Sequence, residues 1–333
     1  MGTSQLRSIS LFSGCMGLDL GLERAGIFPA AVVEKDEVCQ NTIRRNRPGL
    51  PIFGDVFSAS GGQLCEAAGG SVDAVVGGPP CQSFSTIGKR KSVVDSRGRA
   101  LLEYIRLVKE IHPRFFVLEN VRGLLSAKKD DGYLFPWLLR QFQTMGYTVE
   151  HGLLNSRNYG SPQNRIRVVM IGSLEGAVML PAPMKTRGKT LGDAIRDIEE
   201  ETPADCARFS PRLAGFLSKI PPGGDWRNLS RRDQDVAMGR ANRGSGGLTA
   251  FYRRLSYDRP CPTLVTAPTQ RGTTLCHPSF IRPLSVEEYR RIQGVPPSWE
   301  LSGSTTHKYR QLGNAVPCEL AEAVGRAVRE AAR

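Results

Sequence analysis

The 333-residue sequence has no apolar run that approaches the roughly 20 residues needed to span a membrane. Its first six residues lack the apolar core of a secretory signal, and a leucine at position 6 breaks the myristoylation pattern. Eight cysteines are too sparse for a disulfide scaffold and include no Cys-x-x-Cys pair, and the four histidines are scattered, so no zinc site is visible. We therefore expect a cytoplasmic protein with reduced thiols, no bound metal and no membrane partner.

Acidic residues are also in the minority. Asp and Glu number 32 against 45 Lys and Arg, which gives a formal net charge of +13 and a pI of about 9.6. A basic excess favours a polyanionic partner, nucleic acid first, although a merely basic surface is the alternative. The length is sufficient for one large core plus a smaller domain.

The segment Gly-Gly-Pro-Pro-Cys-Gln-Ser-Phe-Ser occupies residues 77–85. The apolar, β-branched run at 72–76 predicts a buried strand before it, and the glycine pair with Pro79 and Pro80 predicts a stiff turn. This places Cys81 just beyond a strand end, where open α/β sheets bind ligands. Because a thiolate is a strong nucleophile, Cys81 is a candidate nucleophile; a small buried cysteine that only packs is the alternative.

Strand and helix patterns alternate to about residue 172, which indicates an α/β domain with a mainly parallel sheet. A strand at 8–12, a glycine turn at 13–17 and a helix from Leu18 form its opening unit. Further strands are expected at 30–33, 114–118, 149–154 and 168–171, with helices at 101–111, 285–293 and 319–331. Frequent prolines after 173 predict a smaller, loop-rich domain, so we divide the chain into 1–175, 176–280 and a returning segment, 281–333.

Several charged residues fall at the ends of these strands. Glu34 is placed to bind a ribose hydroxyl pair and Asp55 repeats the arrangement, although solvated carboxylates and helix caps are alternatives. Glu119 has apolar neighbours that can raise its pKa, so that it can serve as an acid. Arg165 and Arg167 share a strand face by their spacing and could grip a base carbonyl, a phosphate or Glu119, or belong to an ion-paired edge strand.

Two stretches concentrate positive charge. Residues 85–99 hold five Lys or Arg against one Asp, which predicts a mobile basic loop beside Cys81 or an ordinary solvated loop. Residues 219–273 hold ten Lys or Arg against four Asp, which predicts a basic face on the smaller domain.

In order and spacing, several motifs resemble the DNA (cytosine-5) methyltransferases of bacterial restriction–modification type. They are Pro-Pro-Cys-Gln at 79–82, Glu-Asn-Val at 119–121, Gln-x-Arg-x-Arg at 163–167, Gly-Asn-Ala-Val-Pro at 313–317, Leu-Phe-Ser-Gly at 11–14 and the late helix segment at 282–296. The resemblance covers nearly the whole chain, except much of 173–250. It implies a Rossmann-like methyltransferase domain and a target-recognition domain at about 176–280.

The resemblance implies S-adenosylmethionine as cofactor, with Phe12 facing the adenine, Glu34 the ribose hydroxyls and Asp55 the adenine amino group. The missing Gly-x-Gly-x-x-Gly loop is consistent, because this cofactor has no phosphate. The implied cofactor residues are Phe12, Gly14, Gly17, Leu18, Glu34, Asp55, Val56, Asn314 and Ala315.

The resemblance also implies that Cys81 attacks carbon 6 of a cytosine flipped out of duplex DNA, which activates carbon 5. Glu119 would hold or protonate ring nitrogen 3 and Arg165 would contact the base carbonyl, with Arg167 in the same catalytic set. The expected DNA contacts are Ser85, Arg97 and Thr263. Double-stranded DNA is the expected partner of a monomer that functions beside a restriction endonuclease.

Three alternatives remain from the sequence. A tRNA cytosine-5 methyltransferase would share the fold, but that group's Cys-Phe-Thr signature is missing. A catalytically silent DNA-binding regulator would not need Cys81, Glu119 and Arg165 intact. A redox or other thiol enzyme is not favoured by the cofactor and arginine motifs.

Overall fold

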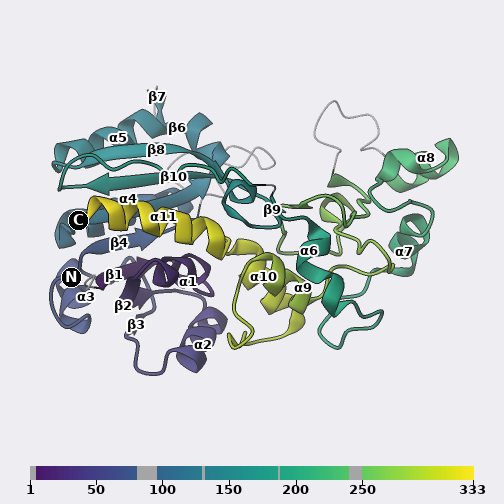
Figure 1. The fold of residues 1–333 in the computed structure, drawn as a ribbon, viewed down its shortest axis with the longest axis horizontal. Helices are drawn as coiled ribbons and strands as arrows, with labels where there is room; N and C mark the ends of the chain where they lie inside the picture. Colours follow the sequence, from purple (N-terminus) through teal and green to yellow (C-terminus); the bar gives the residue numbers. More distant parts are fainter. Residues whose placement is uncertain (1–4, 81–95, 130–131, 187, 240–249) are drawn as a thin grey trace.

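The computed structural model describes residues 5–80, 96–129, 132–186, 188–239 and 250–333. Its centre is a seven-stranded sheet in the order β3-β2-β1-β4-β5-β10-β8 (Figure 1). The first five strands pair in parallel, whereas β10 is antiparallel to both β5 and β8. The predicted α/β fold with a mainly parallel sheet is confirmed. The strands of this sheet are β1 (Leu6–Leu11), β2 (Ile27–Val33), β3 (Ile52–Phe53), β4 (Ala74–Gly77), β5 (Phe115–Val121), β8 (Thr148–Asn155) and β10 (Ile166–Ser173).

Helices cover both faces of the sheet because its central strands are apolar on both sides. Val75 and Phe116 pack into the core with α3, α4 and α5, whereas Val76 and Val117 pack with α1 and α11 on the opposite face. The helices of this part of the chain are α1 (Gly17–Arg24), α2 (Glu37–Asn46), α3 (Gly61–Ala67), α4 (Ser96–Ile111), α5 (Leu134–Thr144) and α11 (Cys318–Ala331).

The last helix packs closely against the first (Figure 1). A Cβ atom at Gly17 would lie 2.7 Å from the carbonyl oxygen of Val316 and 2.8 Å from the Cβ of Ala315, so only glycine allows this approach. The contact brings the segment around Asn314 beside the loop that follows β1.

Residues 191–281 contribute a lobe at one side of the sheet, where α7 and α8 lie farthest from it (Figure 1). This lobe has an apolar cluster of its own that includes Leu217, Met238 and Tyr252. A second cluster joins Leu255 and Leu264 to α9, α10 and the loop after β1, so the lobe is anchored to the sheet domain. The elements of the lobe and its junction are α6 (Leu191–Ile195), α7 (Pro211–Leu217), α8 (Arg231–Met238), β9 (Gln163–Asn164), β11 (Cys261–Pro262), α9 (Val286–Ile292) and α10 (Thr305–Asn314). The remaining short elements are β6 (Lys128–Lys129), β7 (Gly132–Tyr133) and the 3₁₀ turns η2 (Arg122–Ser126), η3 (Ser156–Tyr159), η4 (Arg196–Ile198), η5 (Trp226–Asn228) and η8 (Arg271–Thr273).

Two local expectations were wrong. Residues 119–121 belong to β5 rather than follow it, because β4 ends opposite Leu118 while β10 continues to pair as far as Val121. Arg167 belongs to β10, which lies between β5 and β8, so it is not on an edge strand, and Arg165 lies in the link between β9 and β10 and not on a strand with Arg167.

Within the described ranges, no helix is both long and apolar enough to cross a membrane. The same residues contain no group of three or more His, Cys, Asp or Glu side chains arranged to hold a metal ion.

Candidate active site

A cavity of about 930 Å³ lies at the carboxyl ends of the parallel strands. It brings together every predicted site residue whose side chain the structure describes. These are Phe12, Gly14, Gly17, Leu18, Glu34, Asp55, Val56, Glu119, Arg165, Arg167, Thr263, Asn314 and Ala315. Pro79 and Pro80 also line the cavity, so the chain continues toward position 81 from its wall. Cys81 and Ser85 lie outside the described residues, and Arg97 belongs to α4 but its side chain is not among those described.

The loop after β1 is held in an unusual conformation. Phe12 has a φ of 58°, in the left-handed region that side chains other than glycine rarely adopt, and Gly14 has a φ of 54°. The Gly14 amide donates a 2.7 Å hydrogen bond to Glu34 Oε2, and the Asp36 amide donates one of 2.7 Å to Glu34 Oε1. Burial raises the pKa of Glu34, and these backbone hydrogen bonds act in the opposite direction. Glu34 therefore ties the loop after β1 to the end of β2.

Glu119 and Arg167 form an ion pair on the cavity wall. Arg167 Nε lies 2.7 Å from Glu119 Oε1, and the two side chains are only 13% and 12% exposed. They reach each other diagonally across the antiparallel β5–β10 pair. A Cβ atom at Gly78 would lie 2.8 Å from Glu119 Oε2, so the second carboxylate oxygen occupies space that glycine leaves open. Glu119 is thus fixed between Arg167 and the turn that leads to Cys81.

The side chain of Asn120 supports the turn at Pro79 that leads to Cys81. Its side chain is buried, with Nδ2 donating to the Pro79 carbonyl at 3.1 Å and Oδ1 accepting from the Val121 amide at 2.8 Å. The sequence placed Asn120 in a motif without giving it a role. Its place in an otherwise apolar strand could have indicated a structural role, because a buried amide needs a specific hydrogen-bond partner.

Arg165 connects three segments that are distant in sequence. Its two terminal nitrogens donate to the carbonyl oxygens of Leu264 and Asn314, each at 3.3 Å. Burial lowers its pKa and so does the neighbouring charge of Arg167, while Glu119 raises it. Its Nε is buried without a hydrogen-bond partner. Since an unpaired buried donor is costly, an acceptor bound in the cavity would be favoured there.

The Thr263–Leu264 pair is fixed to the segment before β10. The Thr263 hydroxyl donates to the Asn164 carbonyl at 3.1 Å, and the Leu264 amide donates to Gln163 Oε1 at 2.9 Å. Gln163 Nε2 in turn donates to Gln293 Oε1 at 2.7 Å, and Gln293 Nε2 donates to the Ala315 carbonyl at 3.0 Å. One chain of hydrogen bonds therefore fixes segments from the lobe, the sheet and the C-terminal part at the cavity.

Other residues that line the cavity were not predicted from the sequence. Cys15 and Cys39 do so, and burial raises the pKa of Cys15 to about 12 and that of Cys39 further, so both remain protonated thiols. Asp19 also lines it, with a fully buried carboxylate. Its position in the first turn of α1 gave no sign in the sequence that it would face inward.

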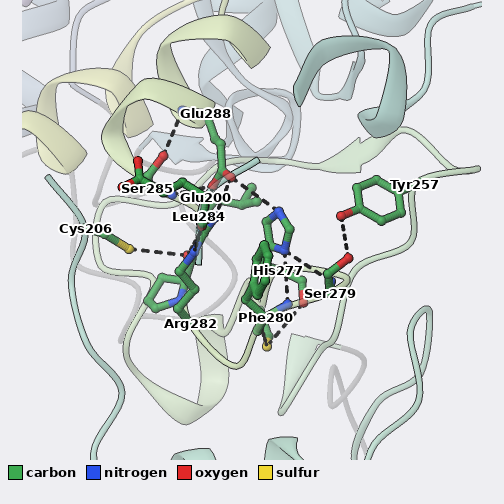
Figure 2. Close-up of polar contacts among 12 residues, drawn as sticks. Glu200, Cys206, Tyr257, His277, Ser279, Phe280, Arg282, Leu284, Ser285 and Glu288 are labelled. Atoms are coloured by element: carbon green, nitrogen blue, oxygen red, sulfur yellow. Dashed lines mark hydrogen bonds and ion pairs between the residues drawn. The ribbon is translucent and has the colours of Figure 1, made fainter. Parts of the chain in front are cut away.

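A second polar cluster lies at the base of the lobe, away from the cavity (Figure 2). Arg282 binds both oxygens of Glu288 at 2.8 Å, and His277 Nε2 lies 3.3 Å from Glu288 Oε1. His277 Nδ1 accepts from the amides of Ser279 and Phe280, so it is the unprotonated nitrogen. Because Glu288 also completes the capping box of α9 with Ser285, the cluster joins the lobe to the start of that helix.

The comparisons with known proteins agree with this geometry. The family described as C-5 cytosine-specific DNA methylase matches residues 6–330. The chain belongs to this family. The methylase is 37% identical to the Type II methyltransferase M.Sau96I of Staphylococcus aureus over 320 residues, covering 95% of this chain and 74% of the relative. It is 37% identical to the Type II methyltransferase M.Eco47II of Escherichia coli over 330 residues, covering 96% and 78% of the two chains.

Solved structures share the fold of the methylase. A putative DNA modification methyltransferase encoded within an E. coli prophage superimposes with a TM-score of 0.71 at 23% identity, covering 98% of this chain and 99% of that one. The Entamoeba histolytica methyltransferase EhMeth gives a TM-score of 0.71 at 15% identity, covering 99% of each chain. The predictions of the family, the methyltransferase fold and the enzyme class DNA (cytosine-5) methyltransferase are confirmed.

Proposed function

We propose that this methylase transfers a methyl group from S-adenosylmethionine to carbon 5 of a flipped-out cytosine in a short double-stranded DNA sequence, through a covalent bond to Cys81. One observation supports this most directly: a single cavity contains the Glu34 loop, the Glu119–Arg167 pair and the turn that leads to Cys81. Its volume of about 930 Å³ is at the upper end for small-molecule sites, which suits a nucleoside cofactor beside a base.

The residues present fit the cofactor. Each Glu34 oxygen accepts one backbone hydrogen bond, which leaves a lone pair on each for a ribose hydroxyl. Phe12 offers a ring on the cavity wall, and Asp55 lies beyond β3 as a carboxylate for an amino group. The buried carboxylate of Asp19, which has no hydrogen-bond partner, fits the positive charge that the cofactor carries. When bound, S-adenosylmethionine supplies an electrophilic methyl group.

The chain's own residues activate the base. The Cys81 thiolate forms a bond to carbon 6, and the electron pair of the 5,6 double bond makes carbon 5 nucleophilic. Glu119 holds or protonates ring nitrogen 3, and Arg165 Nε offers a donor to the base carbonyl. After carbon 5 has gained the methyl group and lost its proton, the bond from sulfur to carbon 6 breaks and the thiolate is restored. These steps require a base outside the duplex stack, at a cost of a few kcal/mol for flipping.

Residues 176–280 are proposed to read the DNA sequence as a target-recognition domain. Ten Lys or Arg against four Asp between 219 and 273 provide the phosphate-binding charge. Thr263 is fixed at the cavity, while Ser85 is proposed as a contact from the basic segment and Arg97 as one from the start of α4, which begins at Ser96 and so shortens the predicted loop at 85–99. The relatives named Type II methyltransferases support a functional pairing with a restriction endonuclease, and we propose that the methylase acts as a monomer.

Methyl transfer from labelled S-adenosylmethionine to mixed-sequence duplex DNA, followed by bisulfite sequencing, tests this function. We expect methylated cytosines in one short sequence context. The Cys81→Ser variant should lose turnover and keep DNA binding, while Cys65→Ser on α3, outside the cavity, should retain activity. Incorporation into tRNA alone, or normal turnover by Cys81→Ser, would contradict the proposal.

A further inference from the structure

Five carboxylates among the described residues line the cavity, and four of them are engaged. Glu34 accepts two backbone amides, Asp36 caps α2 and pairs with Arg310, Asp55 pairs with Lys35, and Glu119 pairs with Arg167. Asp19 differs from the other four. It is 1% exposed, and neither of its oxygens has a hydrogen-bond partner.

A buried carboxylate without a hydrogen-bond partner destabilises the folded protein, because no protein contact replaces the hydration that it loses. Because burial disfavours the charged form, it raises the pKa of Asp19 to about 7. Ser10 lies close enough to lower this pKa, but not in the geometry of a hydrogen bond. Glu23 on the same helix raises the pKa and Arg47 after α2 lowers it, so the nearby charges oppose each other. Arg47 itself binds Glu23 at 2.6 Å.

We infer that Asp19 is the counter-ion for the α-ammonium group of the methionine part of the bound cofactor. This rests on the proposed use of S-adenosylmethionine. Asp19 lines the cavity together with Ser10, Gly17 and Leu18 at the end of β1 and the start of α1, whereas Asp55 follows β3, two strands away in the sheet. An amino-acid tail carries one cation, and Asp19 is the cavity carboxylate left without a partner in the described residues.

The other cavity groups do not replace Asp19 in this role. Glu34 accepts a backbone hydrogen bond on each oxygen and its remaining lone pairs are proposed to bind the ribose hydroxyls, and Glu119 is bound to Arg167. Asp36 and Asp55 are paired with cations of the chain. An ammonium group at Asp19 would stabilise the ionised form of a carboxyl group that burial otherwise drives toward neutrality. Asp19 would also make binding selective, because a ligand without an amino group would leave its carboxylate unpaired.

Calorimetric titration with S-adenosylhomocysteine and with its deaminated analogue tests the inference without turnover. Wild-type methylase should bind the deaminated ligand on the order of 10- to 100-fold more weakly, as expected for a hydrogen bond between charged groups. Asp19→Asn keeps the shape of the side chain but removes its charge, so it should weaken the binding of S-adenosylhomocysteine by a similar factor. The dissociation constants of the two ligands should then differ by less than about twofold in this variant. Glu66→Gln, at an exposed position of α3 outside the cavity, is the control and should discriminate as the wild type does.

Two outcomes would overturn the inference. Equal binding of both ligands by the wild type would exclude a counter-ion for the ammonium group, and this measurement needs no variant to fold. Undiminished discrimination by Asp19→Asn would assign the ammonium to another residue, and if this variant also binds both ligands equally more weakly, Asp19 has a structural role only. Absence of S-adenosylhomocysteine binding by the wild type would instead contradict the proposed cofactor, so the two failures are distinguishable.

Discussion

Arg167 Nε and Glu119 Oε1 are 2.7 Å apart across the antiparallel β5–β10 pair. The guanidinium fixes one oxygen of a carboxylate whose other oxygen faces Gly78. A planar, charged donor orients a carboxylate in a way that a flexible ammonium does not. Arg167 is therefore a positioning residue for the group proposed to act on ring nitrogen 3.

Arg167→Gln should lower kcat by roughly 10²-fold or more, because a misplaced Glu119 loses most of the benefit of general-acid catalysis. Arg167→Lys should recover only part of this rate. Single-turnover methyl transfer measures the effect, and the Kd for S-adenosylhomocysteine should stay near that of the wild type. Arg326→Gln breaks an exposed pair on α11 and should change neither quantity. An unchanged single-turnover rate in Arg167→Gln would contradict this role.

Gly78→Ala should reduce activity without unfolding the protein. The added Cβ would lie 2.8 Å from Glu119 Oε2, so the carboxylate must move away from its present position. We expect a loss of roughly tenfold or more in kcat, since small misplacements of a catalytic group are costly. Gly62→Ala is the matched control, because a Cβ there meets nothing within 4 Å on α3. It should keep full activity and gain about 0.5–1 kcal/mol in the free energy of unfolding.

Glu288 should make the free energy of unfolding depend on pH in the acidic range. Burial alone would raise its pKa, but the hydrogen bonds from Arg282 and the nearby His277 ring lower it from 4.5 to about 2 (Figure 2). Because the folded-state pKa is depressed, its contribution is fully present above about pH 4.5 and is lost as the pH falls toward 2. The stability difference between wild type and Glu288→Gln should therefore shrink over this window in denaturant titrations. Glu300→Gln, in an exposed pair with Arg45, should show a small difference at every pH.

Arg282→Met leaves the buried Glu288 carboxylate without its main partner. Breaking a buried pair in this way should cost about 3–5 kcal/mol in the free energy of unfolding. Urea denaturation of the variant measures the cost, and the double variant Arg282→Met with Glu288→Gln should recover part of it. A cost below about 1 kcal/mol would mean that the pair behaves as a surface ion pair.

Gln163→Ala removes a side chain that both donates to Gln293 and accepts from the Leu264 amide. Two buried groups would lose a partner, at about 1–3 kcal/mol each, so we expect a loss of about 2–6 kcal/mol in the free energy of unfolding. Gln143→Ala, at an exposed position of α5, should stay within about 0.5 kcal/mol of the wild type. Equal stability of the two variants would contradict the proposed anchoring of the lobe.

Local patterns predicted much of the sheet domain. The apolar run before Cys81 became β4, and the helix expected from Ser285 is α9, which Ser285 and Glu288 cap together. These features depend on residues close together in the chain, so the sequence can report them. The extension of β5 through Glu119 could not be read in this way, because it depends on pairing with β10.

Site residues in motifs or at strand ends were predicted, whereas polar residues that are buried only in the folded protein were missed. Arg165 and Asn314 came from motifs and Glu34 from its place at a strand end, and the structure brings them to one cavity, although their roles remain predictions. Asp19 and Asn120 were not singled out, because polar residues on a helix or strand give no sign of which way they will face. The link from Gln163 to Gln293 joins residues 130 positions apart, which a single sequence does not reveal.

The cavity wall joins a segment that is made early to a segment that is made late. Cys15 on the loop after β1 contacts the Gln311 carbonyl, 296 residues later. At translation rates of 5–20 residues per second, the later segment is made roughly 15–60 s after the earlier one. The cavity therefore lacks part of its wall until the segment around Gln311 has been made and has packed against the loop after β1.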